Sequence, residues 1–354
     1  MSSNGDPERL EVAVVGAGQA GLAIGYFLAR QGCRFAIFDR ADAVGAAWRD
    51  RWDSLVLFTP RRYDSLPGMR FQGEPDGYPT RDEVVAYLES YATTFELPVE
   101  LGSTVRSLTK GGEAFVLRVD GRSVEADQVV VATGPFQTQR VPAWASELAP
   151  EVVQIDSAAY RASSDLPTGT VLVVGGGNTG FQIATELATT HDVHLSIGSR
   201  QAALPQRLLG RDLFSWLVAV RLMDKTVDSR IGQRMRTRET LVGQSRRGVR
   251  RLGVELKARA VGASGRTVRF VDGTELAVDA VIWATGFRLD HSWINLPITT
   301  EEGELRHRRG VTDIPGLYFL GLPWQHTRGS ALLGWVKDDA EYIAHQIAAY
   351  RPTE

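Results

Sequence analysis

Short apolar runs, glycine-rich turns and segments of helical period follow one another in a recurring order along the chain. The first set begins with the apolar run 12–15, continues through GAGQAG at 16–21 and ends with a Pro-free segment that stops at Gly32. A short apolar run bounded by glycine is typical of a buried strand, and a periodic segment followed by glycine is typical of a helix. The sequence therefore predicts a strand, a tight turn and a helix over residues 12–32, with a further strand at 35–39.

A second set repeats this order at residues 169–191, where a predicted strand is followed by GGGNTG at 175–180 and by a helix. The leading glycines lie 159 positions apart (175 − 16). The Asp-Gly turns at 120–121 and 272–273, and the strands that end in Ala-Thr-Gly at 134 and 286, both repeat after 152 positions (272 − 120 and 286 − 134). Such a duplication predicts two α/β nucleotide-binding folds of the same plan.

The segments between these landmarks are less regular. Residues 44–68 are too irregular for a strand or helix and too apolar for a flexible linker. A helix is predicted after Thr80, which serves as its N-cap with Glu83 as the capping-box partner. The apolar stripe of this helix comprises Val84, Val85, Tyr87, Leu88 and Tyr91.

Two later segments complete the pattern. Residues 208–251 are helical in composition and rich in arginine. A basic run is compatible with nucleic-acid binding, but no aromatic interleaving or recognition motif accompanies it, so a solvated helical insertion beside the second nucleotide site is the favoured interpretation. Residues 314–350 predict a strand, a loop and an amphipathic helix from about Ser330, which complete the first fold.

The two glycine-rich turns indicate dinucleotide binding. In the first, Gly16 permits the tight turn, Gly18 lets backbone amides approach a pyrophosphate, and Gly21 lets helix and strand pack closely. The positive end of the helix dipole then faces the phosphates. Asp39 closes the second strand, where its carboxylate accepts hydrogen bonds from the hydroxyls of an unphosphorylated ribose.

The second turn differs at the ribose position. The acid lies 23 positions after Gly16 (39 − 16), and the same offset from Gly175 leads to Gly198, followed by Ser199 and Arg200. A carboxylate would repel a 2′-phosphate, whereas Arg200 with Ser199 would bind it. The second site is therefore predicted to take NADPH, the alternative being that Arg200 is a solvated residue at a strand end.

Composition narrows the remaining possibilities. Cys33 is the only cysteine, which excludes dithiol chemistry and structural disulfides and favours a packing role for this residue. The formal net charge of −2 gives no reason to expect nucleic acid or an anionic membrane as partner. No apolar run approaches the ~20 residues of a membrane span, and the N-terminal segment lacks the apolar core of a signal peptide, so a cytoplasmic protein is expected.

With these motifs the chain resembles the flavin-containing monooxygenases, in particular the small bacterial members, the plant YUCCA-type enzymes and the bacterial flavoproteins associated with cation efflux. The resemblance covers essentially the whole chain, and its more specific strings are VGAAWRDRWDSLVLFTPRRYDSLPG, GYPTRDEVVAYLESYA, VVGGGNTGFQIATELA, LPQRLLGRDLF and VIWATGF. It implies an α/β protein with two Rossmann-like, three-layer ββα domains. The FAD domain comprises residues 1–141 and 288–354, and the NADPH domain, residues 142–287 with the helical insertion at about 208–251, is inserted into it.

The resemblance and the motifs together give the expected cofactor contacts. Those to FAD are expected from Gly16, Gly18, Gln19, Ala20, Gly21, Asp39, Arg40, Trp48, Arg49, Leu57, Val105, Ala132, Thr133, Gly134, Gly321, Thr327, Ser330 and Leu332. Those to NADPH are expected from Gly175, Gly177, Asn178, Thr179, Gly180, Ser199, Arg200, Thr285 and Gly286. The N-terminus of the last helix is expected to face the pyrimidine end of the flavin.

The chain departs from the family at two positions. The family fingerprint has a histidine in the link before the second glycine motif, and Asp156 occupies that slot. Larger members place an asparagine near the flavin where this chain has Thr59, whose hydroxyl is a less directional donor. These changes bear on the mechanism more than on the cofactors.

The leading hypothesis is an NADPH-dependent FAD monooxygenase that uses O2 through a C4a-(hydro)peroxyflavin to oxygenate a small soft nucleophile (sulfur, nitrogen or a metalloid) or a carbonyl. The cofactor supplies the chemistry, no metal site is expected, and the catalytic candidates are Thr59, Asn178 and Gln325. His326 is a further lining candidate, although a lone histidine is more often structural. A homodimer is left open.

Two alternatives remain. One is an NAD(P)H-dependent flavin reductase or oxidase that passes electrons to a protein or quinone without a Cys-x-x-Cys pair. The other is a nucleotide-sensing accessory of ion transport.

Overall fold

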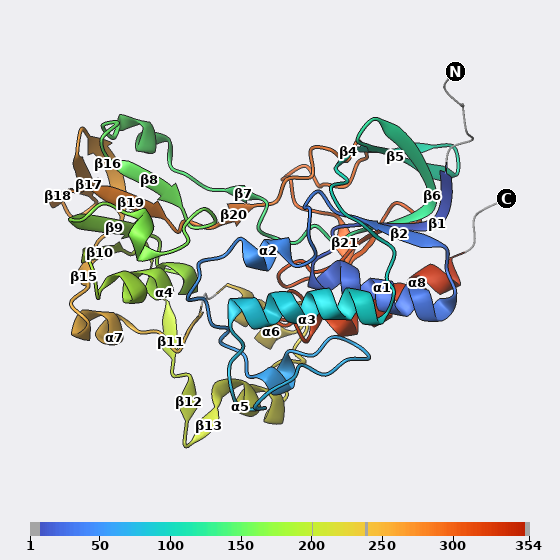
Figure 1. Ribbon diagram of the computed structural model, residues 1–354, viewed down its shortest axis with the longest axis horizontal. Helices are drawn as coiled ribbons and strands as arrows, with labels where there is room; N and C mark the ends of the chain where they lie inside the picture. Colours follow the sequence, from blue (N-terminus) through green and yellow to red (C-terminus); the bar gives the residue numbers. More distant parts are fainter. Residues whose placement is uncertain (1–7, 200, 238–239, 351–354) are drawn as a thin grey trace.

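The computed structural model describes residues 8–199, 201–237 and 240–350, which form two lobes joined by two crossing segments (Figure 1). The crossing segments contain the short strands β7 (Thr138–Gln139) and β20 (Phe287–Arg288), which pair antiparallel. One lobe contains both ends of the described chain, and the other is built from the residues between β7 and β20 (Figure 1). The predicted domain limits at 141 and 288 fall close to this pair.

The first lobe is built on a nine-stranded sheet. Its main path is β21-β22-β23-β6-β1-β2-β3, and β5 and β4 extend it from β6 as an antiparallel meander. The pairs among β23, β6, β1, β2 and β3 are all parallel. The strands are β1 (Glu8–Val15), β2 (Phe35–Phe38), β3 (Val99–Glu100), β4 (Val105–Gly111), β5 (Ala114–Val119), β6 (Arg122–Val131), β21 (His307–Arg308), β22 (Val311–Thr312) and β23 (Leu317–Phe319).

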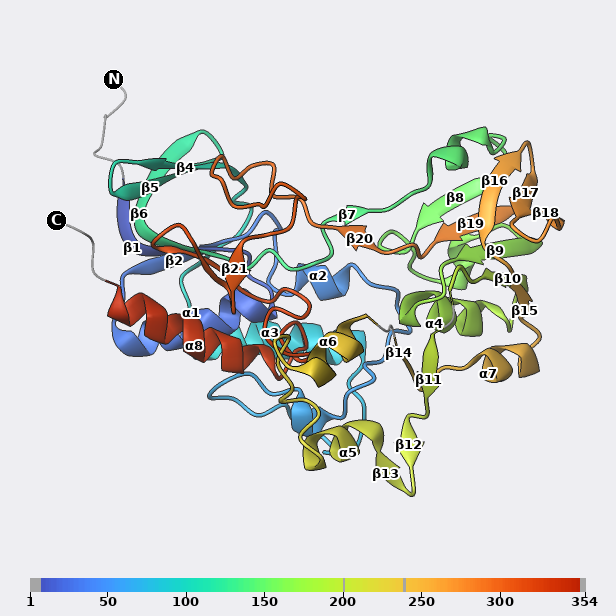
Figure 2. The same cartoon turned by 180° about the vertical axis from the view of Figure 1, so that it is seen from behind.

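Helices cover one face of this sheet. Apolar residues of α1 (Gln19–Gln31), α3 (Arg81–Thr94) and α8 (Val336–Ala349) share one buried core with β1 and β2 (Figure 2). A second core on the other face joins the meander to the loop after β20. The two cores together give the layers of an α/β fold.

The second lobe repeats this plan on a smaller scale. Its parallel sheet has the order β15 (Glu255–Lys257), β10 (Asp192–Ser196), β9 (Thr170–Val174), β19 (Ala280–Trp283) and β8 (Val153–Asp156). Helices α4 (Asn178–Leu187) and α7 (Arg246–Arg251) contribute to the core on one face. The antiparallel strands β16 (Ala260–Ser264), β17 (Thr267–Phe270) and β18 (Glu275–Ala277) pack on the other, which gives the predicted three-layer ββα arrangement.

Several local predictions are confirmed. Helix α1 is followed by Gly32 as a left-handed C-cap (φ 71°). Helix α3 has the predicted capping box of Thr80 and Glu83, and all five residues of its predicted stripe are buried. The Asp-Gly turns at 120–121 and 272–273 connect β5 to β6 and β17 to β18.

Three predictions need correction. Residues 208–251 are helical only in part, because they contain the strands β13 (Arg211–Asp212) and β14 (Thr240–Val242) as well as α5 (Leu213–Ala219), α6 (Arg230–Arg236) and α7. The strands β11 (Ala202–Leu204) and β12 (Arg207–Leu208) lie just before β13. The last helix begins at Val336 rather than near Ser330, because the side chain of Ser330 accepts hydrogen bonds from the backbone of a turn. Segment 44–68 contains a helical turn, α2 (Ala46–Arg49), and the 3₁₀ turn Arg61–Tyr63. The other 3₁₀ turns are Ala143–Glu147 and Ser163–Asp165.

Candidate cofactor sites and cavity

The leading glycine of each motif makes the same contact in its own lobe. Gly16 has φ +110°, and a Cβ atom there would lie 2.6 Å from the carbonyl oxygen of Ala132. Gly175 has φ +135°, and its Cβ would lie 2.0 Å from the carbonyl oxygen of Ala284. Both alanines belong to the Ala-Thr-Gly segments, so the duplication seen in the sequence is also a duplication of the turn geometry.

The third glycines allow the helix to approach the strand. A Cβ atom on Gly21 would lie 1.8 Å from the carbonyl oxygen of Gly16, and one on Gly180 would lie 2.0 Å from that of Gly175. No larger residue fits at either position without a backbone shift.

The middle glycines face open space. Gly18 and Gly177 are the N-caps of α1 and α4, and a Cβ atom on either would meet nothing within 4 Å. Neither helix has a side-chain cap or an acidic residue in its first turn. The free amides and the positive helix ends therefore suit a phosphate group at both positions.

Asp39 lies at the end of β2, beside the first turn. Its carboxylate accepts hydrogen bonds from the backbone amides of Ala17 (2.6 Å) and Ala41 (2.9 Å). The backbone amide of Ser103 donates to the carbonyl oxygen of Asp39 at 2.7 Å, which brings the start of β4 and the predicted residue Val105 to the same edge. The acid thus positions the glycine loop as well as lying where a ribose is predicted.

Further predicted FAD residues gather around the first turn of α1. The indole of Trp48 donates to Gln19 Oε1 at 3.0 Å, and Gln19 Nε2 donates to the carbonyl oxygen of Ala331 at 3.3 Å. Gly321 has φ +84°, and a Cβ atom there would lie 2.8 Å from Cβ of Ala20. These contacts bring three predicted FAD segments, 16–21, 48 and 321–332, to one place.

The remaining predicted FAD residues are more scattered. Gln137 Nε2 donates to Thr133 Oγ1 and to the carbonyl oxygen of Gly134, both at 2.8 Å. Leu57 packs against the cores of both lobes, as Trp48 does. Arg49 forms an exposed ion pair with Glu89. Arg40 is exposed, and Leu332 is half-buried.

Two arginines that the sequence did not single out surround the second ribose position. Arg246 Nη2 donates to the carbonyl oxygen of Ser199 at 3.1 Å, and Arg259 Nη2 donates to that of Gly198 at 2.9 Å. Gln201 lies over the glycine turn, where a Cβ atom on Gly176 would be 2.9 Å from its Nε2. The predicted residue Arg200 lies outside the described residues. Among the described residues, the positive charge at this loop comes from Arg246 and Arg259, which lie 47 and 61 positions after the residues they contact.

The other predicted NADPH residues lie around the same turn. Thr179 belongs to the first turn of α4. The hydroxyl of Thr285 donates a hydrogen bond to the carbonyl oxygen of Arg140. The backbone amide of Arg140 in turn donates to the carbonyl oxygen of Gly286 at 2.9 Å. Thr285 and Gly286 therefore connect to the crossing segment that enters the second lobe.

The three catalytic candidates lie in different surroundings. Asn178 holds strand β14 with both ends of its amide, donating to Thr240 (3.2 Å) and accepting from the amide of Val242 (2.9 Å). Thr59 is buried and donates to Asp64 Oδ1 at 2.6 Å. Gln325 lines a cavity together with His326. In the part of the chain that the structure describes, no hydrogen bond joins any two of these three side chains.

Asp64 is a buried acid that sequence reasoning missed. Its side chain is fully buried, and Oδ2 has no hydrogen-bond partner. Burial raises the pKa of Asp64 to about 7, against the opposing effects of the Thr59 hydrogen bond and the Arg61 charge. No local pattern signals this position, because its burial depends on packing against the segment before α8, where a Cβ atom on Gly334 would strike the backbone at Tyr63.

The cavity has a volume of about 1060 Å³. Its walls come from the loop after β20, from β21, from residues 322–326 and from residues 227–236 of the insertion. The backbone amide of Val227 donates to the carbonyl oxygen of His326 at 2.8 Å, which holds the insertion of the second lobe against the first. Through the amide of Asp290, which donates to Gln137 Oε1 at 2.6 Å, one wall also connects to Thr133 and Gly134.

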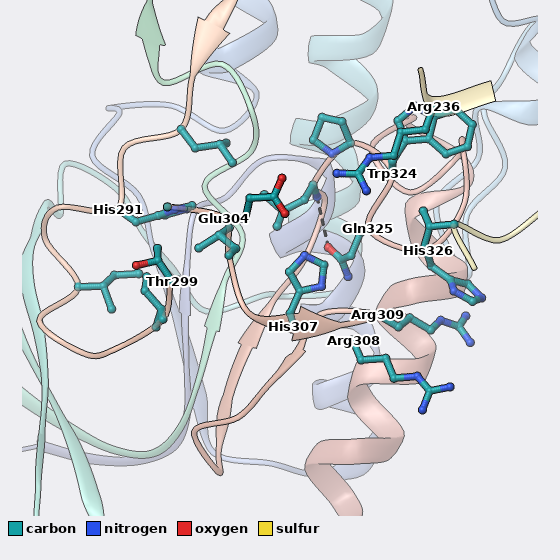
Figure 3. Close-up of a pocket in the computed structure, with 18 of the residues that line it drawn as sticks. Arg236, His291, Thr299, Glu304, His307, Arg308, Arg309, Trp324, Gln325 and His326 are labelled. Carbon is teal, nitrogen blue, oxygen red and sulfur yellow. Dashed lines mark hydrogen bonds between the residues drawn. The ribbon is translucent and has the colours of Figure 1, made fainter. Parts of the chain in front are cut away.

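Unpartnered polar atoms face this cavity. Gln325 is 2% exposed, and its Nε2 atom has no partner; its Oε1 accepts from the amide of Leu322 at 3.3 Å. His291 Nε2 is buried and also lacks a partner. In Figure 3 the side chains of His291, His307 and Gln325 point toward the interior. Buried atoms of this kind are suited to a ligand that supplies the missing hydrogen bonds.

The three cavity histidines are neutral at neutral pH. Burial is the main cause that lowers the pKa of His291, of His307 and of His326. The Arg236 charge lowers the pKa of His307 further, and the Arg309 charge does so for His326. Each imidazole therefore offers one donor and one acceptor.

Asp156, which replaces the family histidine, has a local structural role. Its Oδ1 accepts hydrogen bonds from the backbone amides of Ala158 (2.8 Å) and Ala159 (2.9 Å). The turn leads into Tyr160, whose buried hydroxyl donates to Glu186 at 2.9 Å. An acceptor-only side chain suits this turn, because both partners are donors.

Two kinds of feature are absent from the described residues. Across residues 8–199, 201–237 and 240–350, no three His, Cys, Asp or Glu side chains are grouped so that they could hold a metal ion. Nor does this part of the chain contain a helix of the length and apolar character that a bilayer crossing requires.

Known proteins share this architecture. The family model described as pyridine nucleotide-disulphide oxidoreductase matches residues 13–209. An oxidoreductase of Geobacillus kaustophilus with the name CzcO-like is 44% identical over 96% of this chain and 98% of its own length. The indole-3-pyruvate monooxygenase YUCCA1 of Oryza sativa is 28% identical over 90% of this chain and 88% of its own length. A solved flavin-containing monooxygenase from Stenotrophomonas maltophilia has a TM-score of 0.81 and 30% identity, with coverage of 97% of this chain and 99% of that one.

These similarities confirm the predicted α/β fold with two dinucleotide-binding units and the predicted oxidoreductase class. A flavin and a pyridine nucleotide are the cofactor classes of this group, in agreement with the predicted FAD and NADPH. The individual cofactor contacts stay predictions. The chain belongs to the pyridine nucleotide-disulphide oxidoreductase family and, within it, to the flavin-containing monooxygenases.

Proposed function

We propose that the protein is an NADPH-dependent FAD monooxygenase that oxygenates a small soft nucleophile (sulfur, nitrogen or a metalloid) or a carbonyl. The observation that carries the proposal is the pair of uncapped helix ends, α1 and α4, each with an open glycine at its N-cap. One chain thus has two turns suited to a phosphate, and residues of both lobes wall one cavity.

When bound, the cofactors supply the redox chemistry: the nicotinamide provides hydride, and the flavin activates O2. The protein's own groups bind and orient. The amides at Gly18 and Gly177 hold the two pyrophosphates, and Asp39 accepts hydrogen bonds from the ribose of the first nucleotide.

The preference for NADPH rests on positive charge without a competing acid. Arg246 and Arg259 donate to the loop at 198–199, and Ser199 adds a hydroxyl. Their guanidinium groups are suited to a 2′-phosphate. We expect Arg246→Ala with Arg259→Ala to lower kcat/KM for NADPH roughly 10- to 150-fold, the scale of a hydrogen bond to a charged group. kcat/KM for NADH should change little.

Arg251→Ala is the matched control, because Arg251 is an exposed arginine of α7, the helix that begins with Arg246. Equal losses for NADPH and NADH in the double variant would show that these arginines do not read the 2′-phosphate.

The substrate site is assigned to the cavity. Gln325 supplies a donor through its unpartnered Nε2, and the neutral His291 supplies a donor or acceptor through Nε2. Gln325→Leu keeps the size of the side chain and removes the amide. Because a substrate hydrogen bond contributes about 0.5–1.5 kcal/mol, we expect KM for the substrate to rise about 2- to 13-fold, with the KM for NADPH unchanged.

The overall reaction is tested with isotope-labelled oxygen. The FAD-loaded protein is supplied with NADPH, ¹⁸O₂ and a panel of sulfides, amines, ketones and arsenicals, and product and H₂O₂ are both measured. Incorporation of one ¹⁸O atom into a product, with a matching fall in H₂O₂, supports a monooxygenase. NADPH oxidation that yields only H₂O₂ with every panel member, together with rapid reduction of a quinone, would favour the reductase alternative.

A further inference from the structure

A hairpin of the insertion projects from the edge of the molecule. Strands β12 (Arg207–Leu208) and β13 (Arg211–Asp212) pair antiparallel and lead directly into α5. Figures 1 and 2 both show this hairpin and α5 extending beyond the two sheets. Its tip is Leu209-Gly210.

The tip exposes apolar side chains. Leu209 is 85% exposed, more than any other large apolar residue of the described chain, and Leu208 is 48% exposed. Val218 and Val220, at the end of α5, are also exposed. Leu208 and Leu209 thus place two adjacent exposed large apolar side chains at one turn.

Local backbone preference does not explain the leucine. Leu209 has φ +52° and Gly210 has φ +76°, so both central turn residues are left-handed. This turn favours Asn-Gly or Asp-Gly, because a left-handed backbone is unfavourable for a bulky residue. A polar residue at position 209 would fold better and be better hydrated.

The base of the hairpin is held rigidly. Asp212 is buried and accepts hydrogen bonds from the hydroxyl of Tyr78 (2.7 Å), from Gln206 Nε2 (2.8 Å) and from the amide of Phe214 (2.7 Å). Phe214 stacks on Phe58 with ring centroids 5.8 Å apart. The tip is therefore presented in one orientation by contacts to the first lobe.

Cationic and aromatic groups surround the tip. Arg207 and Arg211 flank it and are exposed. The indole of Trp216 donates to the carbonyl oxygen of Leu208 at 2.9 Å, and the guanidinium of Arg211 lies 5.7 Å from the Trp216 ring. Asp212 points inward, and Arg221 at the end of α5 pairs with Asp224 at 3.3 Å. Arg207 interacts with the hydroxyl of Tyr78 and, more weakly, with the charges of Asp76 and Asp212. Asp76 is itself paired with Arg62.

We propose that this hairpin docks the protein on the surface of a bilayer that contains anionic phospholipids. A projecting apolar tip within an arginine and tryptophan collar matches the headgroup boundary, where leucine inserts and arginine meets phosphate. A two-residue convex tip is too small for the area of about 1,000 Å² that a stable protein interface needs. The net charge of −2 does not oppose docking, because charges beyond about 10 Å are screened.

The experiment uses the FAD-loaded full chain and sedimentation with vesicles of phosphatidylcholine, with and without about 30 mol% phosphatidylglycerol. We expect weak, reversible binding to the anionic vesicles alone, lost near 0.5 M NaCl, where the Debye length is about 4 Å. Leu208→Ser with Leu209→Ser should raise the half-saturating lipid concentration at least about 10-fold. Arg207→Gln with Arg211→Gln should raise it roughly 10- to 25-fold, since each arginine contributes about 5-fold.

Val271→Ser is the matched control, because Val271 is 67% exposed in a turn of the second lobe. It should bind vesicles like the wild type, and melting temperature and FAD content report folding for every variant. The proposal is overturned if the wild type does not sediment with anionic vesicles, or if the leucine and arginine variants both bind as tightly as Val271→Ser. A dimer that the leucine variant makes monomeric, without vesicle binding, would instead assign the tip to a second copy of the chain.

Discussion

Gly177→Ala tests the proposed phosphate site on α4 with a single methyl group. Gly177 has φ −80°, a conformation open to alanine, and the added Cβ would meet nothing within 4 Å. Alanine is a poorer N-cap than glycine, but it also reduces the freedom of the unfolded chain by about 0.4–1 kcal/mol. These effects oppose each other, so we expect the free energy of unfolding to change by less than about 1 kcal/mol.

The methyl group occupies the space in which the pyrophosphate is proposed to lie. It should weaken one or more hydrogen bonds to a charged group, each contributing about 1.5–3 kcal/mol, and so raise the Kd for NADPH roughly 10- to 150-fold. Anaerobic stopped-flow measurement of flavin reduction against NADPH concentration gives this Kd. FAD content, which depends on the first lobe, should stay unchanged.

Gly180→Ala is the contrasting variant. Its Cβ would lie 2.0 Å from the carbonyl oxygen of Gly175, so it should lose stability whether or not a nucleotide binds. An unchanged Kd for NADPH in Gly177→Ala would refute a pyrophosphate at this helix end. A fall in melting temperature equal to that of Gly180→Ala would show that the space is not open.

Three further predictions concern single positions of the chain. The free energy of unfolding should fall as pH rises through about 5 to 7, by up to about 1.4 kcal/mol per pH unit, because Asp64 holds its proton more tightly in the folded protein (pKa about 7) than in the unfolded chain. Urea titrations should show a smaller change of this free energy with pH for Asp64→Asn than for the wild type. An equal change in both proteins would contradict the raised pKa of Asp64. Asp156→His, which introduces the family's histidine, should lower stability by about 1–3 kcal/mol in the same assay, because two backbone amides lose their acceptor. Gly18→Ala should fold normally yet purify with less FAD, as measured by flavin absorbance per protein.

Local sequence patterns predicted much of the fold. The two glycine turns, the capping box at Thr80 and the Asp-Gly hairpins were all recognisable, because each depends on residues within a few positions of one another. The start of α8 was misplaced by about one and a half turns, since a side-chain interaction of Ser330 holds a turn where the apolar pattern alone favours helix.

The candidate site was only partly accessible in this way. Gln325 was selected from the sequence, and the structure adds that its Nε2 is buried without a partner in a cavity. Asn178 was selected as a possible catalytic group, but its amide is occupied by β14, which lies 62–64 positions later in the chain. His291 and Asp64 carried no local signal.

The sequence by itself determined that the chain contains two dinucleotide-binding turns, that the first has an acid at its ribose position and the second does not, and that no dithiol is present. These properties are set by residue identity at short spacing. Only the tertiary structure decided that residues 227–236 of one lobe wall a cavity of the other, that Arg246 and Arg259 reach the loop at 198–199, and that Leu209 projects from the surface. The physical reason is that burial and charge at these positions depend on which distant segments pack together, and the pattern along the chain does not contain that information.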